Sequence, residues 1–290
     1  MDYQYIEAND VQFAYLEDGP TNGPLALLFH GFPDSPYTWR HLMPDLAARG
    51  YHVIAPAQRG YAPTAVPANK RYQLGQLGLD ANALHEAFGG GEDAVIVGHD
   101  WGAMTTYTAV NLEPHRWRRA VTANVPPLAS VASAFFDVDQ LKRSWYMFFF
   151  QNPLSEMVVP MNDFAFIERL WADWSPGYDA SDDLVHIKAA LSGEDHTLAA
   201  LSYYRAMFDP AYQDAALAEA QAASTAKTTI PTLYLHGRDD GCFALSIVTD
   251  PLAHLAPGSR FEVIDHAGHF LQLQQPTQVN QLICEFFDEA

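Results

Sequence analysis

GHDWG, at residues 98–102, decides the fold of this chain. It follows an apolar run at 94–97 and precedes a helical pattern that begins at Ala103. Glycines on both sides of the central residues allow a sharp turn between a strand and a helix. The nucleophile elbow G-x-S-x-G has this layout with serine at its centre, whereas this chain has Asp100 there. The stretch therefore predicts a strand, a tight turn and a helix, with a carboxylate in place of a hydroxyl as the nucleophile.

Strand patterns alternate with helical patterns on both sides of this turn. Strands are expected at 3–6, 11–16, 25–30, 51–55, 94–97, 117–123, 230–236 and 261–264. Helices are expected at 37–49, 72–88, 103–112 and 278–287. The run at 25–30 is apolar up to its final histidine, which is typical of a strand buried on both faces of a parallel sheet. The alternation predicts an α/β fold with a mostly parallel central sheet and flanking helices.

A long segment without strand patterns interrupts this alternation. After Pro127 the sequence becomes rich in aromatic residues and mostly helical in period, until the strand expected at 230–236. We therefore expect a helical cap at 127–226, inserted into an α/β core that is formed by 1–126 and 227–290.

The composition is that of an acidic, soluble globular chain. Its 290 residues include 35 Asp and Glu against 16 Lys and Arg, a net charge of −19, which argues against nucleic acid or an anionic membrane as a partner. The sequence shows no signal-peptide pattern and no apolar run of transmembrane length, so we expect a cytoplasmic protein. The 12 histidines form no clustered pattern, and Cys242 and Cys284 lack metal-type spacing. We expect reduced thiols and no metal.

A nucleophile needs a base, and the base needs an orienting acid. In α/β hydrolases these groups follow along the chain in the order nucleophile, acid and histidine. After Asp100, the candidate acids are Asp239 and Asp240, and the candidate bases are His266 and His269, just beyond the last two expected strands. A loop aspartate or histidine alone is most often a turn, cap or surface residue. The ordered triple at strand ends is far more specific for catalysis.

The loop His30-Gly31-Phe32-Pro33 follows the third expected strand, where such enzymes carry their oxyanion loop. The backbone N–H groups of Phe32 and Trp101 are the expected oxyanion hole. The loop also fits an ordinary turn, in which a cis bond before Pro33 is allowed. The two interpretations are compatible.

Four motifs resemble those of epoxide hydrolases in the α/β-hydrolase superfamily. In order they are HGFP at 30–33, GHDWGA at 98–103, GRDD at 237–240 and GHF at 268–270, so the resemblance spans nearly the whole chain. It implies that Asp240, which fits the spacing G-x-x-D, is the acid, and that His269, which fits Gly-His-Phe, is the base. It also implies an enzyme that requires no cofactor.

The resemblance further implies two catalytic tyrosines in the cap. One lies before a Phe-Gln pair, as Tyr146 lies before Phe150-Gln151, and the other directly precedes arginine, as Tyr204 precedes Arg205. Without the resemblance, aromatic residues here are explained by packing within the cap. With both local motifs matched, Tyr146 and Tyr204 are the expected ring-opening pair, and with the two oxyanion-hole residues they are expected to bind the substrate.

Three places depart from the pattern of these relatives. Ala57 stands where aspartate is usual, Tyr61-Ala62-Pro63-Thr64 replaces a more usual Gly-x-Ser ending, and Gln274 stands where many relatives have glutamate. These departures weaken the analogy for the substrate but leave the triad unaffected.

The resemblance implies a reaction that opens an epoxide to a vicinal diol. Asp100 would attack an epoxide carbon and form an alkyl ester, while Tyr146 and Tyr204 donate to the epoxide oxygen. His269, oriented by Asp240, would activate a water molecule that cleaves this ester. The expected substrates are a small apolar epoxide and water, and a homodimer is a possible assembly.

Two other functions remain open. A haloalkane or haloacid dehalogenase can use the same aspartate, with the Trp101 indole N–H holding the halide, although Phe32 supplies no second side-chain donor. A non-catalytic hydrolase-fold binding protein is the second alternative, although a pure binder has no need of a complete triad.

Overall fold

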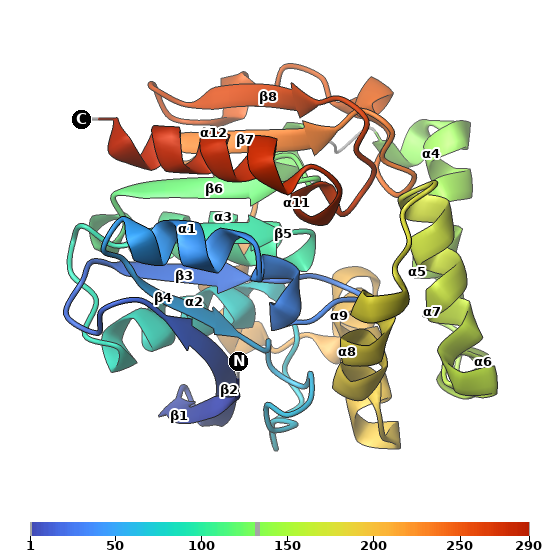
Figure 1. Cartoon of the computed structure of the whole chain (residues 1–290). Helices are drawn as coiled ribbons and strands as arrows, with labels where there is room; N and C mark the ends of the chain where they lie inside the picture. The colour runs from blue at the N-terminus through green and yellow to red at the C-terminus, as the bar shows by residue number, and fades with distance from the viewer. Residues whose placement is uncertain (1, 131–133, 290) are drawn as a thin grey trace.

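An eight-stranded sheet forms the centre of the molecule (Figure 1). We describe it from a computed structural model that covers residues 2–130 and 134–289. The strands are β1 (Gln4–Ala8), β2 (Val11–Asp18), β3 (Leu25–Phe29), β4 (His52–Pro56), β5 (Val95–His99), β6 (Arg119–Ala123), β7 (Thr232–Gly237) and β8 (Arg260–Ile264). Their spatial order is β1-β2-β4-β3-β5-β6-β7-β8. The pairs β1–β2 and β2–β4 are antiparallel, and all others are parallel. All eight expected strands and the mostly parallel α/β fold are confirmed.

Helices cover both faces of this sheet (Figure 1). On one face lie α1 (Leu42–Ala48) and α12 (Pro276–Asp288), and on the other lie α2 (Leu74–Ala87) and α3 (Trp101–Leu112). One buried apolar cluster joins the sheet to α1 and α12, and another joins it to α2 and α3. Strands β3 to β7 are buried on both faces, which explains their continuous apolar runs.

The single helix expected at 37–49 is wrong, because the structure divides it in two. A 3-10 turn forms at Pro36–Trp39, and α1 begins only at Leu42. Pro44 explains the break: proline has no N–H, and its ring clashes with the carbonyl four residues earlier, so it fits only the first turn of a helix. Gly50, with a φ of +88°, follows α1 and ends it as the sequence predicts.

The segment between β6 and β7 lies beside the carboxyl ends of the parallel strands (Figure 1). Its described residues form no strand, and its α-helices are α4 (Val138–Arg143), α5 (Trp145–Phe149), α6 (Leu154–Val158), α7 (Met161–Trp174), α8 (Ser181–Leu191), α9 (Glu194–Phe208) and α10 (Ala218–Ala223). We call α4 to α9, residues 138–208, the lid. Another short helix, α11 (Leu271–Gln274), precedes α12.

The helix α10 packs against the core helices α2 and α3. Its Gln221 side chain accepts a 2.9 Å hydrogen bond from the Gly75 N–H in α2. The division of the chain into a cap at 127–226 and two core parts stays a prediction. Although α10 falls within the predicted cap, it packs on the core helices. None of the helices in the described ranges is both long and apolar enough to cross a membrane.

Candidate active site

Asp100 occupies a strained turn between β5 and α3. Its φ of +53° and ψ of −117° lie outside the ordinary strand and helix regions, and such a conformation costs about 1–3 kcal/mol. The neighbouring glycines make the turn possible, because a Cβ at Gly98 would overlap the carbonyl oxygen of Gly102. The helix begins at Trp101, directly after the strained residue. The strand, tight turn and helix predicted around this stretch are therefore confirmed.

The Asp100 carboxylate meets the loop that follows β3. The Phe32 N–H donates a 2.7 Å hydrogen bond to Asp100 Oδ1. Gly31 permits this approach, since a Cβ there would overlap the carboxylate. Trp101 is the first residue of α3, so its N–H has no acceptor within the helix. The Phe32–Pro33 peptide bond is cis, which the sequence analysis allows for this turn. The role of the Phe32 and Trp101 N–H groups as an oxyanion hole stays a prediction.

His269 lies between the two predicted carboxylates. Its Nδ1 is 3.1 Å from Asp240 Oδ2, and its Nε2 is 3.6 Å from Asp100 Oδ2. All three side chains are buried. Asp239 and His266, the alternative acid and base, are exposed. The structure therefore brings together Asp100, Asp240 and His269 and leaves the alternative residues outside the group.

Backbone hydrogen bonds hold the acid and the histidine in place. Asp240 Oδ1 accepts from the N–H groups of Cys242 and Phe243, at 2.7 and 3.0 Å, which leaves Oδ2 for His269. The His269 N–H donates to the carbonyl oxygen of Trp174 at the end of α7, at 2.9 Å. A lid residue thus fixes the backbone of His269, so the position of His269 depends on the packing of the lid.

The charges around His269 favour its protonated form. Burial by itself lowers the pKa of His269, because it removes water from the imidazolium. The Asp240 and Asp100 carboxylates outweigh burial and raise the pKa of His269 from 6.5 to about 10. The two carboxylates therefore favour the imidazolium form of the ring in the unliganded protein at neutral pH.

The two predicted tyrosines face each other above Asp100. Tyr146 lies on α5 and Tyr204 on α9, and their ring centroids are 5.6 Å apart. The Tyr204 ring contacts the rings of Phe32 and Trp101 edge to face, with centroids 5.2 and 5.1 Å away. Burial raises the pKa of each tyrosine well above 10, and nearby groups including Asp100 raise it further. Both hydroxyls therefore keep their protons and can donate them.

A cavity of about 50 Å³ joins these groups. Asp100, Trp101, Tyr146 and Tyr204 line it, together with apolar side chains of the lid and of α3. Pockets that bind drug-sized ligands usually measure about 300–1,000 Å³. The lid is therefore closed over Asp100, and an organic ligand must displace side chains to enter.

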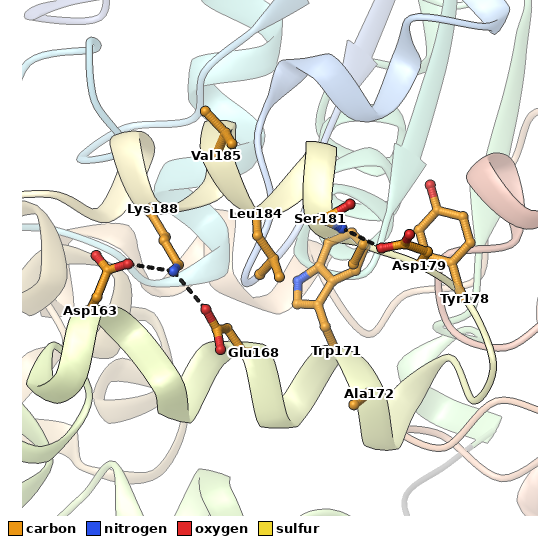
Figure 2. Close-up of a pocket in the computed structure, with 11 residues that line it drawn as sticks. Asp163, Glu168, Trp171, Ala172, Tyr178, Asp179, Ser181, Leu184, Val185 and Lys188 are labelled. Carbon is orange, nitrogen blue, oxygen red and sulfur yellow. Dashed lines mark hydrogen bonds and ion pairs between the residues drawn. The ribbon is translucent and has the colours of Figure 1, made fainter.

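A larger pocket of about 640 Å³ lies between α7 and α8 (Figure 2). Figure 2 shows Lys188 between Asp163 and Glu168, and its Nζ is 2.6 Å from an oxygen of each. This cation is already paired, and no predicted site residue lines the pocket. Nowhere in the described ranges do three His, Cys, Asp or Glu side chains gather as metal ligands. We therefore assign the candidate site to the smaller cavity, which holds the carboxylate and both hydroxyls.

Several of the positions that depart from the family pattern make local hydrogen bonds. Thr64 Oγ1 donates to the Ala57 carbonyl oxygen at 2.7 Å, so two of the changed positions support each other. Gln274 Oε1 accepts from the Gly268 N–H at 2.7 Å, which a glutamate oxygen would do equally well. The Gln274 bond thus keeps the loop before His269 supported.

Some residues that shape the site lie within or beside a motif that gives them no role. Cys242 Sγ lies 3.4 Å from Tyr146 Oη, and Met147 and Met207 line the cavity. His99 Nε2 donates to the His269 carbonyl oxygen at 2.7 Å. Their one signal in the sequence is a place in or beside a motif, since His99 lies within GHDWG and Cys242 follows the GRDD stretch. That signal does not say what the side chain contacts.

Comparison with known proteins gives a consistent result. The model of the alpha/beta hydrolase fold family matches residues 24–276. Epoxide hydrolase A of Mycobacterium tuberculosis is 30% identical to this chain, over 97% of it and 95% of the relative. Epoxide hydrolase 3 of Xenopus tropicalis is also 30% identical, over 98% of this chain and 77% of the relative.

Solved structures agree with the sequence matches. Epoxide hydrolase A from Mycobacterium thermoresistibile superimposes with a TM-score of 0.81 at 26% identity, covering 98% of this chain and 97% of its own. The Bacillus megaterium epoxide hydrolase, solved with an inhibitor, gives a TM-score of 0.83 at 25% identity, covering 99% of this chain and 100% of its own.

Proposed function

We propose that this chain, which belongs to the α/β-hydrolase fold family and to its epoxide hydrolases, uses Asp100, His269, Asp240 and two lid tyrosines to convert a small apolar epoxide and water into a vicinal diol. One observation carries the proposal: a carboxylate and two protonated tyrosine hydroxyls line the same buried cavity. An epoxide needs a nucleophile on carbon and a donor on oxygen, and this cavity offers both.

The first step makes an ester on Asp100. Oδ1 is held by the Phe32 N–H, so Oδ2 is the oxygen that attacks the epoxide carbon. A carbon–oxygen bond forms to Oδ2 while the epoxide carbon–oxygen bond breaks. The released alkoxide takes a proton from the Tyr146 and Tyr204 pair, a general-acid contribution of about 10²–10⁴ in rate.

The second step hydrolyses this ester. The His269 imidazolium first gives its proton to the tyrosine oxygen that lost one in ring opening. The neutral ring then removes a proton from water, and the resulting hydroxide attacks the carbonyl carbon of esterified Asp100. Negative charge develops on Oδ1, where the Phe32 N–H already donates and the Trp101 N–H is free of helix bonds. Collapse of this intermediate passes its hydroxyl proton to the leaving alkoxide, which releases the diol and restores the Asp100 carboxylate. The proton taken from water stays on His269 and restores the imidazolium of the unliganded protein.

The apolar cavity favours an apolar substrate. Met104, Val125, Met147 and Phe243 surround the polar groups, so a charged epoxide would lose its hydration without compensation. Cytoplasmic location and a homodimer are further predictions that the fold leaves open to experiment.

Dehalogenation is the second candidate function. The Trp101 indole N–H is buried beside Asp100 and makes no hydrogen bond of good geometry among the described residues, so a departing halide would compete for it only with the neighbouring Tyr204 hydroxyl. Two tyrosine hydroxyls, however, suit a basic alkoxide better than a halide, which needs no proton. We therefore rank the epoxide reaction first.

A product assay tests these alternatives. The purified protein is incubated with a terminal aryl epoxide and, separately, with a terminal haloalkane, and diol and halide are measured. We expect diol from the epoxide, no halide from the haloalkane, and neither product from Asp100→Ala. Halide without diol would make the protein a dehalogenase, and stabilisation by a ligand without any product would make it a binding protein.

A further inference from the structure

Cys242 lies where the loop of the acid meets the lid. Its side chain is 1% exposed, and its Sγ is 3.4 Å from Tyr146 Oη. Its N–H donates to Asp240 Oδ1 at 2.7 Å, and its carbonyl oxygen accepts from Gln140 Nε2 of α4 at 2.9 Å. One residue therefore contacts the orienting acid, the lid and the hydroxyl of a proposed donor.

The two tyrosine hydroxyls differ in their surroundings. Tyr204 Oη is buried and its O–H finds no acceptor in the part of the chain that the structure describes, while the neighbouring Trp101 side chain acts on it as a donor that lowers its pKa. Tyr146 Oη is in contact with the Cys242 thiol. Both tyrosines line the cavity, so Tyr204 is free to meet a ligand at once, whereas Tyr146 must exchange or share its contact with sulfur.

A thiol suits such an exchange because it is both a weak donor and a weak acceptor. With the cavity empty, the Tyr146 O–H can donate to Sγ. When the O–H turns to an epoxide oxygen, the S–H can rotate and donate to Tyr146 Oη instead. Burial raises the pKa of the Cys242 thiol well above 9, so the sulfur keeps the proton that this second arrangement needs.

We propose that Cys242 is a positioning residue for ring opening, whose thiol holds the Tyr146 hydroxyl toward the cavity and donates to its oxygen while Tyr146 protonates the epoxide oxygen. The S–H bond is not broken, and the proton that reaches the alkoxide is that of tyrosine. The S–H lowers the cost of the negative charge left on the tyrosine oxygen. This role rests on the proposed function, because it needs Tyr146 to be a donor.

The experiment measures the rate of ester formation in a single turnover with a terminal aryl epoxide. The variants are Cys242→Ala, Cys242→Val as a second variant that fills more of the space, and Cys242→Ser, which restores a donor. Cys284→Ala is the matched control, since Cys284 is also buried but lies on α12. Ester hydrolysis is followed separately.

We expect Cys242→Ala and Cys242→Val to slow ester formation by about three- to tenfold, the effect of one neutral hydrogen bond. Ester hydrolysis should stay unchanged, and Cys242→Ser should recover part of the loss. The decisive comparison repeats Cys242→Ala in a Tyr146→Phe background, where no further slowing is expected because the hydroxyl that the thiol serves is gone.

If Cys242→Ala slows ester formation equally with and without the Tyr146 hydroxyl, the inference is overturned, and Cys242 acts only by packing in the core. Unchanged ester formation in folded Cys242→Ala or Cys242→Val would also overturn it. Either result leaves the proposed function intact, provided that the unmodified protein still forms diol. Absence of diol from the unmodified protein would instead refute the proposed function itself.

Discussion

The charge of Asp100 couples the two proposed chemical steps. In the unliganded protein, the carboxylates of Asp240 and Asp100 overcome burial and raise the pKa of His269 to about 10. A protonated His269 cannot accept a proton from water. Ester formation converts Asp100 into a neutral group and removes one of these two charges, so the pKa of His269 falls. The histidine thus becomes a base at the stage when a base is needed.

Replacing His269 should separate the two steps. In His269→Gln, Asp100 can still attack the epoxide, but nothing activates water, so the ester should accumulate. Intact-protein mass spectrometry should show a gain equal to the mass of one epoxide. Asp100→Ala is the control and should show no gain. A protein that turns over normally without His269 would refute its role as the base.

His269 should also make stability depend on pH. Its pKa is raised above the unfolded value, so its contribution is fully present below about pH 6.5 and is lost as the pH rises toward about 10. We expect the free energy of unfolding of the unmodified protein, relative to His269→Gln, to decline across this range. Urea denaturation at several pH values measures it, with the exposed His115→Gln as control. If the free energies of unfolding of the unmodified protein and of His269→Gln change with pH in parallel, the pKa of His269 is not raised in the folded protein.

At the scale of elements, parallel strands explain why much of the site was predictable. Phe32 follows β3, Asp100 follows β5, Asp240 follows β7 and His269 follows β8. The carboxyl ends of parallel strands share one edge of the sheet, so residues far apart in the chain meet there. Strand patterns therefore placed the candidates at this edge, resemblance to a family favoured Asp240 and His269 among them, and exposure in the structure separates Asp240 from Asp239.

The lid residues followed no such rule. Tyr146 and Tyr204 lie on different helices. Neither the hydrophobic periodicity of these helices nor a position at the end of a strand predicts that the two side chains meet. Their meeting depends on how α5 and α9 pack, and the sequence indicated it only through resemblance to a family. The Cys242 contact was missed for the same reason. The break before α1, by contrast, could have been predicted from the sequence, because Pro44 is enough to explain it.

The meeting of α5 and α9 predicts that both tyrosines share one task. Replacing Tyr146 and Tyr204 together by phenylalanine should slow ester formation by about 10²–10⁴, the usual size of general-acid catalysis. Each single variant should lose less, because the other hydroxyl remains. Stopped-flow quenching of tryptophan fluorescence can follow the step, since Trp101 lies against Tyr204.

Tyr203→Phe is the matched control for this pair. Tyr203 is the neighbour of Tyr204 on α9, but its hydroxyl donates to the Arg59 carbonyl oxygen at 2.8 Å rather than lining the cavity. Nearly normal ester formation in the double variant would refute the assignment of the lid tyrosines.

At the scale of the whole molecule, the lid is fastened to the core at several points. Trp171 Nε1 of α7 donates to the Pro33 carbonyl oxygen at 2.8 Å, and the Arg40 guanidinium pairs with Asp183 of α8 at 2.6 Å. These contacts hold the lid over Asp100, where it would exclude bulk water from the proposed ester. The same closure leaves a cavity too small for most organic molecules, so entry must depend on movable side chains.

Met207 is the side chain best placed to limit substrate size. A neighbouring pocket of about 200 Å³ shares Trp101, Leu128 and Met207 with the Asp100 cavity, so these side chains separate the two spaces. Methionine is flexible enough to move. Met207→Ala should join the spaces and raise the kcat/KM of a bulky epoxide, relative to a small one, by about tenfold or more.

Met157→Ala is the control for this change, because Met157 lies on α6 with 61% of its surface exposed. It should leave the ratio of the two kcat/KM values unchanged. The ratio is the informative quantity, since a general loosening of the lid would alter both substrates alike. If Met207→Ala folds and leaves the ratio unchanged, the second pocket is no part of the substrate path, and bulky epoxides must enter by opening of the lid itself.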